Sequence, residues 1–334
     1  MLRLGVLDQS PVPAGSGPAD ALAATCDLAR LADRAGYHRY WVAEHHNSEG
    51  LAGSAPEVLV GAVAATTDRI RVGSGGVMLT HYSPLKVAEV FGVLACLYPG
   101  RIDLGVGRAP GSDPDTLVAL APTGTPTSLE TYPARVRELV AWLEGATSDR
   151  GVAARPTAEP PPEVWLLASS IDSASIAAHL GLPLAWADFI TTGDGAPIVR
   201  AYLDQYRPSP GRPEPRALVA VGVICADSDA EAHRLASSVY RWRAGGLRGP
   251  VPPPDPAPGD RPSDDTPAPG PGTGVTRVGP RRRPLVVGSP ATCRDRLSAI
   301  ADAHGVDELM VVTIVFDHEA RRRSYELLAE AFAL

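Results

Sequence analysis

YWVAEHH, residues 40–46, is a short apolar run that ends in three titratable residues. Residues 40–43 are aromatic or apolar throughout, which is typical of a β-strand buried on both faces. Glu44, His45 and His46 follow directly. The active sites of α/β barrels and open α/β sheets lie at the carboxyl ends of such strands. This stretch therefore predicts a buried parallel strand and, at its end, a candidate active site.

Strand-like runs alternate with helix-like runs along the 334 residues of the chain. The eight candidate strands cover residues 2–7, 39–43, 70–79, 101–106, 164–168, 184–187, 217–225 and 308–314. Intervening helices favour parallel pairing, because each return to the same sheet edge needs a long crossover. A closed (β/α)8 TIM barrel is the simplest architecture with this number of strands. We expect residues 1–334 to form a single domain of this kind.

One segment fits neither strand nor helix. Between residues 250 and 280, eleven of 31 residues are proline, and glycine and acidic residues fill much of the remainder. No packed core forms from such a composition. We therefore expect a flexible proline-rich loop over residues 248–283, inserted before the last strand. It is either a passive insertion or a mobile cover over the active site.

Composition narrows the function classes. The net charge of −7 does not favour attraction to nucleic acid or to an anionic membrane, because both are negatively charged. The four cysteines form no Cys-x-x-Cys pair, and the contiguous residues 44–46 lack the helical spacing of paired metal ligands, so we expect no metal site. No apolar run is long enough to span a bilayer, and the first residues carry no signal-peptide pattern. We expect a cytoplasmic protein.

His45 is the strongest catalytic candidate. Imidazole titrates near neutral pH, so it can accept or donate a proton, or donate a hydrogen bond to a developing anion. The alternative is a buried structural histidine paired with a carboxylate. Two adjacent histidines and a glutamate at the catalytic end of a strand favour function. In an extended chain His46 points to the opposite side, so we expect only one of the pair to face the site.

Two further segments carry groups suited to a flat, phosphorylated ligand. Gly75 and Gly76 lie near the end of a predicted strand, where a backbone without side chains lets a ring approach; a bulge or tight packing is the alternative. Arg108 follows another strand and suits phosphate, although a surface ion pair explains it too. Ser169 and Ser170 precede a helix, as an anion site or as ordinary helix caps.

Together these residues resemble the bacterial luciferase-like flavin monooxygenase family. The matching segments are residues 40–46, 70–80, 83–89 and 99–108, with a weaker match at residues 287–290. The resemblance extends over essentially the whole chain. Within the family, the chain resembles members from antibiotic pathways, such as the luciferase-like monooxygenase of mensacarcin biosynthesis.

The resemblance implies a cofactor, partners and residue roles. Reduced FMN, supplied by a separate flavin reductase, would lie across the barrel mouth, with a cis peptide between Gly75 and Gly76 beneath its ring. Arg108 and the turn at residues 169–170 would hold the phosphate, and His45 would govern protons around the flavin. One oxygen atom from O2 would enter an organic substrate, by hydroxylation or epoxidation of an aromatic or polyketide-type natural product.

The sequence leaves the cofactor and the activity open and departs from the family pattern at two positions. The cofactor of some relatives is the deazaflavin F420, which transfers hydride, and other relatives bind flavin without catalysis. Gly107 stands where luminous members have a reactive cysteine, which argues against light emission, and Ser169 stands where luciferase has an acidic residue. Relatives are commonly homodimers through the helices after the second and third strands. An apolar face at residues 87–94 permits this, and core packing explains it equally well.

Overall fold

The computed structural model describes residues 2–108, 113–121, 128–209, 211–247, 249–256 and 285–334. Eight parallel strands close into a barrel, because the first strand pairs with the second and the last, and each neighbour pairs onward around the ring. In chain order the barrel strands are β1 (Arg3–Asp8), β2 (Arg39–Val42), β3 (Arg71–Met78), β4 (Ile102–Gly107), β5 (Glu163–Ala168), β6 (Leu184–Ala187), β7 (Ala217–Cys225) and β9 (Glu308–Val312). The predicted TIM barrel is confirmed.

A ninth strand, β8 (Val286–Gly288), escaped prediction. The long strand β7 pairs with β9 through residues 219–222 and with β8 through residues 223–225. Its end therefore leaves the barrel and pairs with a strand outside it. A run of three residues is too short to show the alternation by which strands are recognised in a sequence. The last barrel strand therefore follows β8 and its helix.

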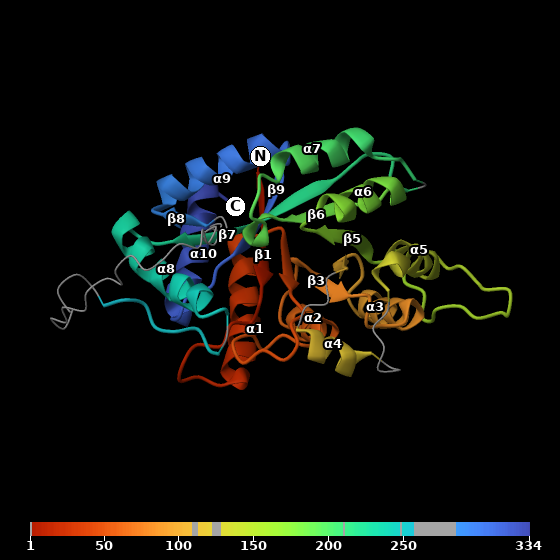
Figure 1. Ribbon diagram of the computed structural model, residues 1–334, viewed down its shortest axis with the longest axis horizontal. Helices are drawn as coiled ribbons and strands as arrows, with labels where there is room; N and C mark the ends of the chain where they lie inside the picture. Colours follow the sequence, from red (N-terminus) through yellow and green to blue (C-terminus); the bar gives the residue numbers. More distant parts are fainter. Residues whose placement is uncertain (1, 109–112, 122–127, 210, 248, 257–284) are drawn as a thin grey trace, which may run out of the picture.

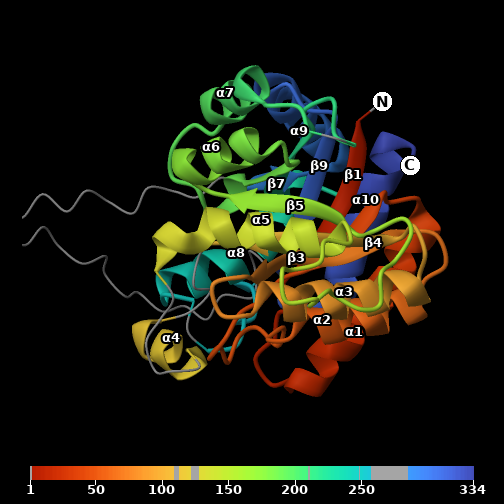
Figure 2. The same ribbon diagram turned by 90° about the vertical axis from the view of Figure 1, so that its right-hand side faces the viewer.

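Helices surround the barrel on all sides (Figures 1 and 2). They are α1 (Pro18–Ala35), α2 (Pro56–Ala65), α3 (Pro84–Leu97), α4 (Pro114–Leu120), α5 (Tyr132–Leu143), α6 (Ile171–Leu180), α7 (Ala196–Gln205), α8 (Asp229–Ala244), α9 (Pro290–His304) and α10 (His318–Phe332), with 3-10 turns η1 (Leu129–Thr131) and η2 (Asp188–Ile190). Five of them begin with proline, whose fixed φ suits the first helical position. In the described ranges, no helix is both long and apolar enough to cross a membrane.

The amino-terminal end of the barrel is closed by a buried charge cluster around Arg39. Its guanidinium donates to Asp103 Oδ2 at 2.6 Å and to both carboxylate oxygens of Glu308, and it lies 4.7 Å from the centre of the Trp165 ring. Burial opposes the charge, but Asp103 and Glu308 outweigh this effect and raise the pKa of Arg39. In TIM barrels the amino-terminal end of the strands contributes mainly to stability, and catalytic residues lie at the carboxyl-terminal end. The cluster therefore lies opposite the candidate active site.

Replacing Arg39 with lysine should destabilise the protein by about 2 kcal/mol, because lysine keeps the charge but lacks the planar fork that serves two carboxylates. Arg234→Lys is the matched control: Arg234 pairs with Glu231 on the surface of α8, its side chain is 29% exposed, and such pairs contribute less than about 1 kcal/mol. Urea unfolding of both variants measures the difference. Equal losses of unfolding free energy in the two variants would show that the buried cluster contributes no more to stability than a surface ion pair.

The predicted proline-rich loop falls largely outside the described residues, since residue 248 and residues 257–284 are not among them. Its first part, residues 249–256, lies against the barrel top. Val251 exchanges backbone hydrogen bonds with Val12 and Ala14 at 2.8 Å, and the Trp242 indole donates to the Gly249 carbonyl at 2.9 Å. These contacts hold this part of the segment between the β1–α1 loop and α8. The mobile-cover role stays a prediction.

The apolar face at residues 87–94 packs into the protein rather than outward. Val87, Phe91 and Leu94 of α3 belong to the main hydrophobic core, which surrounds the barrel. The core-packing interpretation therefore accounts for this face. The exposed apolar side chains of the same region are Val93, Leu97 and, on α2, Val58.

Candidate active site

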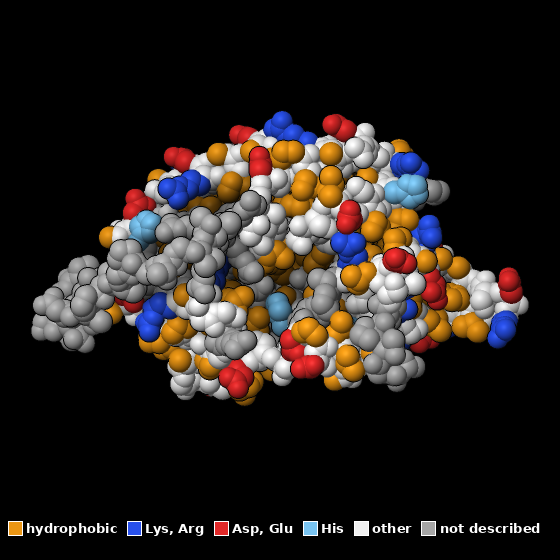
Figure 3. Space-filling model, viewed as in Figure 1, with side chains coloured by type: hydrophobic (Ala, Val, Ile, Leu, Met, Phe, Trp, Pro, Cys, Tyr) orange, Lys and Arg blue, Asp and Glu red, His pale blue; other side chains and the backbone are white. Residues whose placement is uncertain are grey.

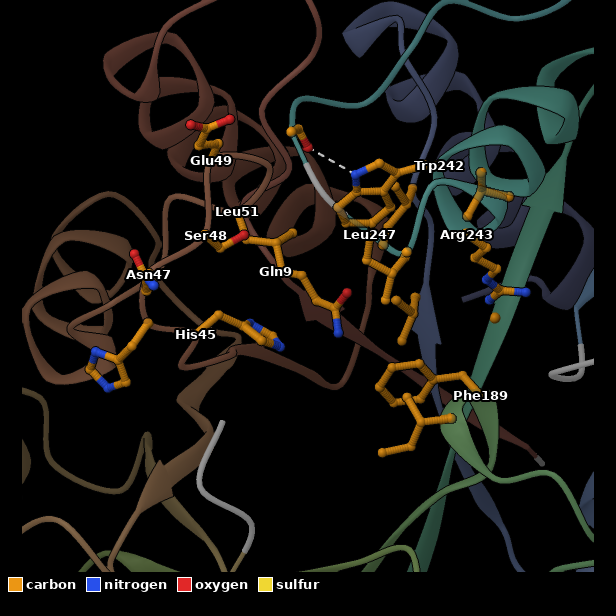
Figure 4. A pocket seen from close by; sticks show the side chains of 18 of the residues that line it. Gln9, His45, Asn47, Ser48, Glu49, Leu51, Phe189, Trp242, Arg243 and Leu247 are labelled. Atoms are coloured by element: carbon orange, nitrogen blue, oxygen red, sulfur yellow. Dashed lines mark hydrogen bonds between the residues drawn. The ribbon is translucent and has the colours of Figure 1, made fainter. Parts of the chain in front are cut away.

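Two adjoining chambers open at the carboxyl ends of the barrel strands. The inner chamber, about 340 Å³, reaches into the barrel as far as Leu7 and Trp41. The outer chamber, about 690 Å³, lies above it, between the β2–α2 loop and α8 (Figure 4). On the face shown in Figure 3, hydrophobic side chains border a central hollow. Site and fold agree, because this is the end of a barrel at which catalytic residues gather.

The inner chamber brings together five of the six residues that the sequence singled out. These residues are His45, Gly75, Arg108, Ser169 and Ser170. They follow or belong to four different strands, β2, β3, β4 and β5, so only the closed barrel places them around one space. Gly76 lines neither chamber.

The two glycines serve different purposes. The peptide bond between them is cis, as the family resemblance implies. A Cβ on Gly76 would lie 2.6 Å from the Gly105 carbonyl oxygen, so strand β4 already fills the space beside it. A Cβ on Gly75 would meet Leu7 at 2.5 Å at the wall of the inner chamber. The register between β3 and β4 also shifts between Ser74 and Val77, an irregularity consistent with the bulge named as the alternative for these glycines.

Arg108 and the start of α6 form a cradle of donors. The Arg108 guanidinium donates to Ser170 Oγ at 3.2 Å, and Ser170 caps the helix by accepting from the Ser173 backbone. The helix cap is therefore Ser170, and Asp172 lies 3.9 Å from the guanidinium with a side chain 72% exposed. A guanidinium, two serine hydroxyls and the amides of a helix start suit a phosphate group. Ser173, in the first turn of α6, lines the same chamber.

His45 is positioned by a backbone bond and keeps its ring available. Its backbone N–H donates to the Gly53 carbonyl at 2.7 Å. In the described part of the chain, the buried Nδ1 has no hydrogen-bond partner. Burial, followed by the effect of neighbouring His46, lowers the pKa of His45 to about 4. The ring is therefore neutral at neutral pH and is able to donate from one nitrogen and accept at the other.

This lowered pKa predicts a pH dependence of stability. Between the ordinary value of 6.5 and the folded value of about 4, the unfolded chain binds a proton at His45 while the folded protein does not, so stability falls as the pH falls through this window. His45→Phe, which cannot titrate, should lose less stability than the wild type over that range. Urea unfolding at a series of pH values measures the difference, and parallel losses would refute the assignment.

The two histidines differ in what they line: His45 lines both chambers, whereas His46 lines the outer chamber and not the inner one. That only one of the pair faces the cofactor stays a prediction. Strand alternation does not establish it, because β2 ends at Val42 before the pair. His46 Nε2 lies 2.7 Å from Glu44 Oε1, and the buried Glu44 carboxylate also accepts from the Tyr82 hydroxyl and the Met78 amide. Glu44 thus ties the histidine loop to the end of β3.

Further residues of the two chambers gave no sequence signal. Gln9 follows β1, Phe189 and Ile190 belong to η2, and Trp242 lies on α8. Each is a single residue outside any motif, and the topology alone brings them to one end of the barrel. In the part of the chain that the structure describes, no group of three His, Cys, Asp or Glu side chains is placed to hold a metal ion.

This fold and site define a class: a TIM-barrel protein with a cradle of hydrogen-bond donors at the edge of an apolar-walled chamber. The sequence profile of the luciferase-like monooxygenase family matches residues 2–308, and the chain belongs to that family. The protein is therefore an enzyme of the luciferase-like, flavin-related oxidoreductases.

Relatives match over nearly their full lengths. The chain is 43% identical to the Bacillus subtilis protein YwcH, with all of both chains covered. It is 40% identical to a luciferase-like monooxygenase of Escherichia coli K12, with 98% of this chain and 96% of the relative covered. Among solved structures, apo-MsnO8 of the mensacarcin pathway superposes with a TM-score of 0.86 at 41% identity, covering 100% of this chain and 99% of the other.

Proposed function

We propose that the enzyme is an FMNH2-dependent, two-component monooxygenase that inserts one oxygen atom from O2 into an organic substrate. The observation that carries this proposal is the meeting of His45, Gly75, Arg108 and Ser170 around the inner chamber. Family membership supports the reaction class, which requires O2 and an organic substrate. The proposed cofactor rests on the chemistry of the chamber.

The residues present fit FMN. The Arg108 guanidinium and the hydroxyls of Ser169, Ser170 and Ser173 would hold the phosphate at the start of α6. Gly75 offers a wall without a side chain to the flat ring. Reduced FMN, when bound, supplies the electrons that activate O2. A separate reductase would deliver it, because the sequence shows no dinucleotide-binding fingerprint of its own.

His45 acts on protons at this site. Its neutral imidazole lies at the wall that the inner and outer chambers share, and its buried Nδ1 is unpaired in the described part of the chain. The ring would hold or deliver a proton where oxygen is transferred. Apolar walls around it, such as Leu7, Trp41 and Phe189, exclude water that would otherwise compete.

The outer chamber would take the organic substrate. Leu51, Phe189, Trp242, Leu247 and Ile314 form the apolar part of a lining that also includes polar and charged side chains such as Asn47, Glu49 and Arg243. The apolar part suits an aromatic or polyketide-type body, and hydroxylation or epoxidation would follow. This assignment places the substrate next to the cofactor, on the other side of the wall that holds His45.

A cofactor comparison tests the proposal. The wild type should bind reduced FMN, use O2 when a flavin reductase and NADH are added, and transfer isotopically labelled oxygen into compounds of an aromatic and polyketide panel. Mass spectrometry detects the label. Preference for reduced F420 over FMN, or tight retention of flavin without any oxygen transfer across the panel, would overturn it in favour of hydride transfer or flavin storage.

We also propose a homodimer through α2 and α3, where Val58, Val93 and Leu97 are exposed. These side chains would be covered by a second copy. Leu97→Glu should therefore give a monomer, whereas Val118→Glu, which replaces another exposed apolar side chain, on α4, should leave the oligomer intact. Light scattering after gel filtration measures both, and a monomeric wild type would contradict the proposal.

A further inference from the structure

Four residues line both chambers and form the junction between them: Gln9, His45, Phe189 and Ile190. Under the proposed function, on which this inference rests, the cofactor lies on one side of the junction and the substrate on the other. The substrate atom that receives oxygen must therefore lie at the junction. Its chemistry has to suit the groups found there.

Gln9 lines the junction because successive side chains along β1 point to opposite faces of the strand. Leu7 and Gln9 both line the inner chamber, while Asp8 between them points away from it into the protein. Figure 4 shows the Gln9 side chain extending between His45 and Phe189. The carboxamide thus projects into the space where the chambers meet.

The backbone beneath Gln9 is fixed by the buried carboxylate of Asp8. Asp8 accepts from Arg321 Nη2 at 2.5 Å, from the Tyr40 hydroxyl and from the Ser10 backbone N–H at 2.7 Å. Burial alone would raise the pKa of Asp8, but Arg321 and Tyr40 outweigh burial and hold the pKa below its ordinary value. Ser10 itself has a positive φ of 49° and shares a hydrogen bond with Thr25. Gln9 therefore has a preset position.

The Gln9 carboxamide is available for a ligand. No hydrogen bond of this side chain to any other residue is found in the described ranges, although the group has two N–H donors and one acceptor oxygen. The junction also carries no formal charge, because its other members are a neutral imidazole and two apolar side chains. The charged residues of the outer chamber, Glu49, Asp113 and Arg243, lie outside the junction.

We propose that Gln9 is a specificity-determining residue whose carboxamide hydrogen-bonds a neutral hydroxyl or carbonyl group of the organic substrate where the two chambers meet. A neutral amide and a neutral imidazole satisfy such a group, whereas an ionised group would be desolvated there without a counter-charge. The preferred substrates thus carry a neutral oxygen function close to the atom that is oxygenated.

The affinities of the enzyme for naphthol and for naphthalene test the proposed role of Gln9, because the two compounds share an apolar body and differ by one hydroxyl. Equilibrium dialysis without flavin gives the dissociation constant of each. The wild type should bind naphthol about tenfold more tightly than naphthalene, as one net hydrogen bond predicts. Gln9→Leu and Gln9→Met should both bring the ratio close to one. Two variants guard against a folding defect in either, and thermal unfolding checks both.

Gln205→Leu is the matched control, since Gln205 is the exposed last residue of α7 and should keep the tenfold ratio. FMN affinity is measured separately in every protein and should stay within about twofold of wild type in the Gln9 variants. A wild-type ratio near one, an unchanged ratio in the Gln9 variants, or a loss of FMN affinity in them would each overturn the role. Failure of the wild type to bind FMN would instead count against the proposed function alone.

Discussion

Replacing His45 with phenylalanine is expected to lower the rate of oxygen transfer to the organic substrate by about 10³-fold, within the range that positioned acid–base groups contribute. Phenylalanine fills the same space but can neither hold nor donate a proton. Binding of FMN should change little, because the donors of the cradle, Arg108 and Ser170, lie on other elements. Transfer of labelled oxygen, measured beside FMN affinity, separates the two effects.

The matched control is His38→Phe. His38 lies at the opposite, amino-terminal end of the barrel, beside Arg39 and Arg71. Its replacement should leave oxygen transfer at the wild-type rate. Full activity in His45→Phe would remove His45 from the chemistry, and an equal loss in both variants would point to a general effect of losing a histidine.

Replacing Arg108 with methionine should weaken FMN binding by roughly 100-fold, because two charge-assisted hydrogen bonds to a phosphate are lost. Affinity for riboflavin, which has the same ring without the phosphate, should change little. The wild type should therefore prefer FMN to riboflavin, and the variant should lose most of that preference. Fluorescence titration of both flavins gives the two dissociation constants.

Arg212→Met controls for the loss of a half-buried arginine. Arg212 also contacts a serine hydroxyl, that of Ser209, and a carboxylate, that of Glu144, but far from the chambers. Its replacement should leave both flavin affinities unchanged. A loss of riboflavin affinity in the Arg108 variant as large as its loss of FMN affinity would place the arginine against the ring and not the phosphate.

The barrel was predictable because its signals are local and repeated. Buried parallel strands are apolar runs, and proline starts helices such as α3 and α9. The strand β8 was not predictable, because three residues carry no period. The sequence could not show what covers the apolar face around Phe91, because packing against the barrel and packing against a second copy require the same residue types.

The site was predictable only in part. His45, Gly75, Arg108 and Ser170 stand at strand ends, and the closed barrel brings strand ends together. The orientation of His46 could not be derived from strand alternation, because β2 ends at Val42, before the histidine pair. Gln9 was missed since its importance comes from its neighbours across the barrel. Only topology reveals that it adjoins both chambers.

A crystal structure of the enzyme with FMN tests most directly whether the inner chamber holds the cofactor. The phosphate should lie within hydrogen-bond distance of Arg108 and Ser170, and the ring should lie in the inner chamber against Gly75 with His45 at its edge. FMN bound in the outer chamber, or with its phosphate away from the start of α6, would contradict this placement.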